Sequence, residues 1–228
     1  TLLDWTNDKK INLSLPSMRA DSFTKELMDK ISTVRTSTLT FAPEAGTPRL
    51  RDIINKNITE SENVTKQVLT SRYQRDSYTL ATKLHSAFFN TVEEREDYFN
   101  TQLEKTGVEY FDYYLIHDVG QDHYKIYNEL DCFTWIQEKK KQGLVKHIGF
   151  SFHDNAELLD RVLTEHPEME FVQLQINYLD WESEGIQSRK CYEVAVKHNK
   201  PVIVMEPVKG GTLADVPERV GQLFKNYH

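Results

Sequence analysis

Polar side chains recur where short apolar segments of this chain end. Lys83 follows the segment Tyr78–Thr82, and His117 ends the segment Tyr113–His117. A lysine ammonium lowers the pKa of a neighbouring proton donor, and a histidine can orient a substrate oxygen. Taken alone, Lys83 can be a packed stem with its amine in water, and His117 a hydrogen-bonded core histidine. At adjacent strand ends, the two form a candidate pair for carbonyl chemistry.

Other polar groups follow the remaining apolar segments. In a βα barrel the reactive groups lie at the carboxyl ends of the strands. A scaffold without a site would not need polar groups at nearly every strand end. The further candidates are Glu44, Asp118, Ser151, His153, Gln175, Asn177, Glu206 and Lys209.

Seven nearly continuous apolar segments are the candidate strands, as is typical of parallel sheets buried on both faces. They are Ile11–Leu15, Thr38–Phe41, Tyr78–Thr82, Tyr113–His117, His147–Ser151, Val172–Ile176 and Val202–Met205. Helical patterns alternate with them, which predicts a parallel α/β fold, TIM-barrel-like and incomplete or open, with about seven strands. A doubly wound sheet is the alternative, but no GxGxxG motif supports it.

Five segments have helical periodicity or end signals: Phe23–Val34, Thr91–Gly107, Ile126–Lys141, Asp154–Leu163 and Tyr192–Ala195. Thr91 and Glu94 have the spacing of a capping box, and Gly107 can end that helix. Asp154 with Glu157 is predicted to open the fourth helix. The run Glu138–Lys141 is expected to be a solvated helix end.

Composition narrows the functional classes. The net charge of −7 argues against nucleic-acid binding. No apolar run is long enough to cross a membrane, and the first residues lack a basic start and an apolar core, so we expect a cytoplasmic protein without membrane contact. Cys132 and Cys191 lie too far apart for a metal motif, so neither a metal site nor an iron–sulfur cluster is expected.

Five motifs occur in one order along the chain: Ala81–Leu84, Phe111–His117, Ile148–His153, Val172–Tyr178 and Val204–Gly211. Together they resemble the aldo/keto reductases over about residues 62–215. The resemblance implies hydride transfer from NADPH to a small-molecule aldehyde or ketone.

That resemblance also implies roles for particular residues. Lys83 and His117 would be catalytic, beside an aspartate and a tyrosine that serves as general acid. Ser151 and Gln175 would hold the nicotinamide carboxamide, and Met205 stands where many members place a ring-stacking tyrosine. The implied cofactor-binding set is Ser151, His153, Gln175, Met205, Glu206 and Lys209.

The sequence departs from the family where the aspartate and tyrosine should precede the lysine strand. No tyrosine occurs before Tyr73, and the context of Asp52 does not match. We therefore predict impaired catalysis. The alternative is a non-catalytic barrel scaffold with at most weak nucleotide binding.

Residues 10–60 carry a second resemblance. Leu13–Phe23 and Thr40–Arg51 are similar to the middle of a radical S-adenosylmethionine enzyme, which implies that Glu44 and Arg49 lie near that cofactor. The cluster-binding CxxxCxxC is absent, because residues 1–131 contain no cysteine. We interpret the chain as one barrel-like domain, 1–228, in which a radical-enzyme-like fragment (1–60) joins a reductase-like fragment (61–228) near 58–64.

Overall fold

The computed structural model describes residues 65–214 and 217–224. Several predictions fall outside these residues. They are the strands Ile11–Leu15 and Thr38–Phe41, the helix Phe23–Val34, the candidate Glu44, the junction near 58–64 and the whole of the second resemblance.

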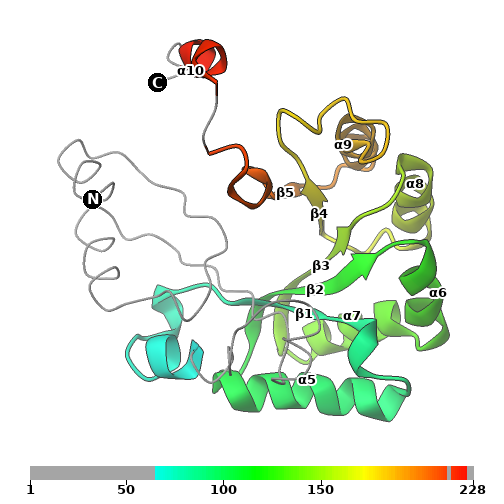
Figure 1. Cartoon of the computed structure of the whole chain (residues 1–228). Helices are drawn as coiled ribbons and strands as arrows, with labels where there is room; N and C mark the ends of the chain where they lie inside the picture. The colour runs from blue at the N-terminus through cyan, green and yellow to red at the C-terminus, as the bar shows by residue number, and fades with distance from the viewer. Residues whose placement is uncertain (1–64, 215–216, 225–228) are drawn as a thin grey trace.

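A five-stranded parallel sheet in the order β1-β2-β3-β4-β5 forms the centre of the described residues (Figure 1). The strands are β1 (Ala81–Leu84), β2 (Phe111–Val119), β3 (Val145–Phe152), β4 (Phe171–Gln175) and β5 (Val202–Met205). The parallel α/β prediction is confirmed, and β5 has the predicted bounds. β1 begins later than predicted because the Leu80 N–H bonds to the Asp112 carboxylate, at 2.9 Å.

Helices follow the strands, and α5 to α9 lie along one side of the sheet (Figure 1). They are α5 (Val92–Thr106), α6 (Gln121–Glu129), α7 (Cys132–Lys141), α8 (Ala156–Glu165), α9 (Ser188–Lys197) and α10 (Glu218–Phe224). A π-helical turn covers Lys66–Thr70, and 3-10 turns cover Arg75–Ser77, Ser86–Phe88 and Lys209–Gly211. None of the helices in the described ranges is long and apolar enough to cross a membrane.

The predicted helix over Ile126–Lys141 is wrong, because two helices, α6 and α7, occupy this region. The chain breaks at Asp131, whose φ of 49° lies in the left-handed region. The preceding Leu130 carbonyl accepts a hydrogen bond from the Arg95 side chain of α5. In a continuous helix, the Leu130 carbonyl would accept a backbone N–H from the next turn. Here the Arg95 side chain supplies the hydrogen bond instead.

The run Glu138–Lys141 is not a fully solvated helix end, which corrects a second expectation. Lys139 is only 6% exposed, and its ammonium pairs with Glu96 of α5. The Lys139 ammonium also lies over the rings of Phe99 and Trp135, at 5.3 and 5.6 Å from the centroids. The charge is therefore part of the contact between α5 and α7.

Helix ends mostly follow their sequence signals. Thr91 accepts the Glu94 N–H at 3.2 Å, and Gly107 has the predicted left-handed conformation, with φ of 69°. The start of α8 differs from the prediction, because Asn155 rather than Asp154 caps it by accepting the Leu158 N–H at 2.9 Å. Asp154 instead accepts the Gln121 N–H at the start of α6, at 2.9 Å.

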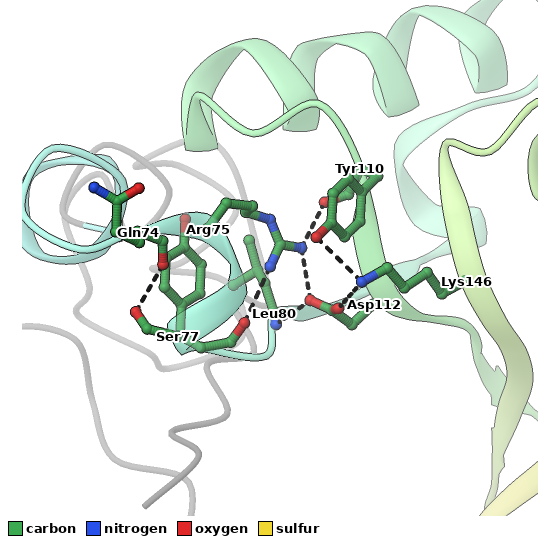
Figure 2. A network of polar contacts seen from close by, with 8 residues as sticks. Gln74, Arg75, Ser77, Leu80, Tyr110, Asp112 and Lys146 are labelled. Atoms are coloured by element: carbon green, nitrogen blue, oxygen red, sulfur yellow. Dashed lines mark hydrogen bonds and ion pairs between the residues drawn. The ribbon is translucent and has the colours of Figure 1, made fainter. Parts of the chain in front are cut away.

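At the amino end of the sheet, a buried carboxylate joins three segments (Figure 2). Asp112 accepts hydrogen bonds from Arg75 at 2.6 Å, the Leu80 N–H at 2.9 Å and Lys146 at 3.0 Å. The Arg75 guanidinium also stacks 3.9 Å from the Tyr110 ring centroid. Burial alone would raise the pKa of Asp112, but these hydrogen bonds outweigh it and hold the pKa below its usual range. A network at the amino face of a βα barrel lies away from the reactive end of the strands, so we assign it to stability.

Replacing Asp112 with asparagine should lower the free energy of unfolding by about 2 kcal/mol at pH 7, because two cations lose their charged partner. The folded-state pKa lies below the unfolded value of about 3.9, so this stabilisation is present above that value and is lost as the pH falls through the folded-state pKa. Urea denaturation should therefore show a constant difference between the two proteins from pH 7 to 5, and a shrinking one below about pH 4. The exposed Asp76→Asn is the control, and a difference that does not change down to pH 3 would contradict this role of Asp112.

Candidate functional site

The strand register places the predicted site residues on one face of the sheet. Partners across parallel strands share a face, as do alternate residues along one strand. Lys83 pairs with Leu115, two residues before His117, and Leu115 pairs with Gly149, two residues before Ser151. Ser151 pairs with Gln173, and Gln175 with Met205. Lys83, His117, Ser151, Gln175 and Met205 thus follow one another across the carboxyl half of one face.

The opposite face of the sheet packs against the helices. Tyr114, Phe150, Val172 and Leu174 belong to the buried core on that side. The helix-covered face therefore supplies most of the buried apolar core, and the other face carries the candidate site residues. The helices hold the strands from behind without covering the candidate site residues.

Lys83 is held in place through its backbone by a buried glutamine of α5. Gln102 is 2% exposed and donates to the Lys83 carbonyl at 3.0 Å. The same amide accepts from the Tyr114 hydroxyl of β2 at 2.7 Å. This residue ties β1 and β2 to one helix, and the Lys83 side chain is half-buried on the other face.

His117 is oriented by Ser151. The Ser151 Oγ is fully buried, accepts the Asp118 N–H at 2.8 Å and lies 3.0 Å from His117 Nδ1. The buried hydroxyl must donate its own proton, and Nδ1 is an acceptor within reach. A neutral His117 then carries its proton on Nε2, where it can donate to a substrate oxygen. Ser151 thus contacts the histidine, and the next residue, Phe152, has no polar group in its side chain to offer a carboxamide.

Three histidines gather at the ends of β1 and β2. The His85 ring lies 4.8 Å from the His117 ring and 5.7 Å from the His123 ring, centroid to centroid. His85 Nδ1 accepts the Ala87 N–H at 3.2 Å, and His123 pairs with Asp118 at 3.3 Å. No group of histidine, cysteine, aspartate and glutamate side chains placed to hold a metal occurs in the described part of the chain.

A tyrosine hydroxyl lies close to this cluster, but it has a structural role. Tyr127 of α6 donates to the His117 carbonyl at 2.5 Å and accepts the Ser86 N–H at 3.1 Å. Burial raises the pKa of Tyr127 well above its ordinary value, so the hydroxyl is a poor proton donor. Within residues 65–214 and 217–224, no tyrosine hydroxyl bonds to Lys83.

Gln175 and Lys209 meet at one buried carboxylate. Asp180, 4% exposed, accepts from Gln175 Nε2 at 2.9 Å and from Asn177 Nδ2 at 2.8 Å, and it forms an ion pair with Lys209. The Lys209 ammonium, together with the two amides, holds the pKa of Asp180 below its usual range. Gln175 Oε1 accepts no hydrogen bond from the described residues, so this acceptor fits the N–H of a nicotinamide carboxamide.

The remaining predicted residues lie around the ends of β3 and β5. Met205 is half-buried on the site face, and Glu206 is exposed, with a φ of 52°. The Glu206 carbonyl accepts from Asn177 Nδ2 at 3.3 Å. His153 is exposed and lies beyond β3. The structure thus brings Lys209 to the carboxylate that binds Gln175 and places the Glu206 backbone beside Asn177, and it leaves the Glu206 and His153 residues exposed.

A cavity of about 50 Å³ lies beside Gln175. It has room for only a few water molecules, so it is no cofactor pocket. Its lining comes from the ends of β3 and β4 and the start of α9: Phe152, His153, Asp154, Leu174, Gln175, Gly185, Ile186, Ser188 and Cys191.

Sequence reasoning missed Asp180, Gln102 and Tyr127. A signal existed for Asp180, because Asn177 starts an Asx turn in which its Oδ1 accepts the Leu179 and Asp180 N–H groups, at 3.1 and 2.9 Å. Gln102 and Tyr127 lie in helices, and no local pattern marks a polar residue that faces a strand end.

The sequence model of the Aldo/keto reductase family matches residues 57–225. An aldo/keto reductase from Brucella melitensis is 24% identical, with a TM-score of 0.51 over 68% of this chain and 55% of that one. An aldo-keto reductase from Bacillus halodurans, in its holo form, is 20% identical, with a TM-score of 0.53 over 68% of this chain and 49% of that one. An uncharacterised protein of Methanocaldococcus jannaschii is 39% identical over 61 residues, 27% of this chain and 13% of that protein. This chain therefore spans about half the length of the two solved relatives and shares their fold.

Proposed function

Because this chain belongs to the aldo/keto reductase family, we propose that it reduces an aldehyde or ketone to an alcohol with NADPH. The observation that carries the proposal is the shared sheet face on which Lys83, His117, Gln175 and Met205 lie in register. When bound, the reduced nicotinamide would supply the hydride. Gln175 would accept the carboxamide N–H, Met205 would lie against the ring, and the loop Glu206–Lys209 would border the rest of the cofactor.

Lys83 and His117 would act on the substrate oxygen. Hydride addition to a carbonyl carbon puts negative charge on that oxygen, which must then gain a proton. The Lys83 ammonium stabilises this charge, and the His117 Nε2–H donates a hydrogen bond to the same oxygen. Ser151 keeps His117 in the required tautomer.

We propose that turnover is slow. The family's tyrosine has no counterpart before Tyr73, and the buried Tyr127 is bonded to backbone groups. Loss of a positioned general acid lowers rates by roughly 10²- to 10⁴-fold. Water would then supply the proton. A chimeric origin, with residues 1–60 drawn from another family, would account for the missing half of the catalytic set and remains part of this proposal.

Isotope transfer tests the reaction directly. NADPH carrying deuterium at C4, prepared separately for each face of the ring, is incubated with the protein and a panel of aliphatic and aromatic aldehydes and ketones. Deuterium should appear at the carbinol carbon from one face only, and mass spectrometry detects it even after few turnovers. If neither of the two deuterated NADPH samples gives more deuterium in the alcohol than a protein-free control, the non-catalytic scaffold is favoured.

A further inference from the structure

We propose that Asp180 is a positioning residue that fixes which end of the Gln175 side-chain amide faces a bound ligand. The inference rests on the proposed nicotinamide site and adds a residue that recognises its carboxamide through Gln175. Asp180 lies in the loop after β4, and its carboxylate would act through its hydrogen-bond partners Gln175, Asn177 and Lys209.

The argument starts from the chemistry of the carboxylate. An ionised carboxylate only accepts hydrogen bonds, whereas a glutamine amide has a donating and an accepting end. Asp180 Oδ2 lies 2.9 Å from the Gln175 amide nitrogen, so the NH₂ group must turn toward it. Gln175 Oε1 therefore points away from Asp180, as an acceptor for an amide N–H.

Asp180 is itself held by its neighbours. Asn177 Nδ2 donates to the same Oδ2 at 2.8 Å, and Lys209 pairs with Oδ1. The Asn177 Oδ1 accepts the Asp180 backbone N–H at 2.9 Å. The two amide groups and the Lys209 ammonium all donate toward the carboxylate, and the backbone bond to Asn177 fixes the position of residue 180, so the carboxylate is held in one orientation. Burial at 4% exposure keeps water from competing for these bonds.

The change Asp180→Asn tests the proposal with little change in shape. Lys209 is charged and only donates, so it would keep the oxygen of the new amide. The new NH₂ would then face Gln175 and the Asn177 Nδ2 group, which would lose its acceptor. The Gln175 amide would then flip to accept from that group and would present its own NH₂ to the ligand. Its preference would change from an amide N–H to a carbonyl oxygen.

Two cofactors separate these preferences. Reduced 3-acetylpyridine adenine dinucleotide phosphate keeps the carbonyl oxygen of NADPH but has a methyl group in place of the amide nitrogen. Their dissociation constants, measured by calorimetry, give a ratio that does not depend on turnover. The wild-type protein should bind NADPH roughly fivefold more tightly than the analogue, the worth of one hydrogen bond. In Asp180→Asn the ratio should fall to about one.

Two further variants complete the experiment. Glu182→Gln makes the same acid-to-amide change at an exposed position of the same loop, paired with Arg189, and should keep the wild-type ratio. Gln175→Met removes the amide and should bring the ratio to about one. If Asp180→Asn does not melt cooperatively, the proposal is judged on the wild-type protein and Gln175→Met. A Gln175→Met variant whose two dissociation constants keep the wild-type ratio would overturn it.

The outcomes also separate this inference from the proposed function. If the wild-type protein binds NADPH saturably but binds the acetylpyridine analogue equally tightly, the role of Asp180 is overturned and the reductase proposal stands. A folded Asp180→Asn variant that keeps the wild-type ratio would do the same. Failure of the wild-type protein to bind either cofactor would overturn both proposals.

Discussion

Replacing Lys83 with methionine should lower kcat/KM for NADPH-dependent carbonyl reduction by at least about 100-fold, because the charge that stabilises the developing alkoxide is lost. Methionine keeps the length and the apolar stem of the side chain. The backbone of residue 83 would still be held by Gln102, so the strand should keep its place. Initial rates at subsaturating substrate, read at the NADPH absorbance band, measure the effect.

The matched control is Lys125→Met, which removes an exposed ammonium whose side chain is 78% exposed and which pairs with Glu129 on α6. This variant should keep the wild-type rate. The melting temperature of Lys83→Met should stay close to that of the wild-type protein. A rate within threefold of wild type for folded Lys83→Met would remove Lys83 from the catalytic pair.

Replacing Gly149 with alanine should destabilise the fold by about 3 kcal/mol, because the added methyl group has no space. Gly149 pairs with Phe171 across β3 and β4. A Cβ at this position would lie 2.5 Å from the Phe171 carbonyl oxygen and 2.7 Å from a carbon of its ring. The backbone oxygen belongs to the sheet and cannot move without separating the two strands.

For a domain of this size, that cost corresponds to a fall in melting temperature of roughly 6 to 12 °C, measured by calorimetry or circular dichroism. Gly185→Ala is the control, since the nearest atom to its added Cβ would be the Ser183 hydroxyl at 3.9 Å. Its cost should stay within about 0.5 kcal/mol. A Gly149→Ala variant as stable as the wild-type protein would mean that β3 and β4 do not approach as closely as the register requires.

The sequence predicted the described strands to within about three residues at each end, because each strand contains a short apolar run. The apolar stripe Leu158, Leu159, Val162 and Leu163 likewise identified the buried face of α8. The break between α6 and α7 was not predictable from local pattern. It depends on Arg95, which lies far away in the chain and captures the Leu130 carbonyl.

In the candidate site, too, local pattern predicted some features, and others depend on residues that are distant in the chain. Alternation along the strands sufficed to place Lys83, His117 and Gln175 on one face once the register was known. The partners of these residues were not predictable, because hydrogen bonds such as those from Gln175 to Asp180 and between Ser151 and His117 depend on loop and strand geometry. Lys139 illustrates the same limit, since its burial follows from the approach of α5 and not from its own run of charges.

The central claim is that the strand ends form a site for a reduced nicotinamide cofactor. A fluorescence titration of the wild-type protein and of Gln175→Met with NADPH tests it most directly. We expect saturable binding to the wild-type protein and a dissociation constant raised roughly fivefold in the variant, for the loss of one hydrogen bond. A signal that rises without saturation, from a wild-type protein that melts cooperatively, would contradict the claim and leave a folded scaffold without a cofactor site.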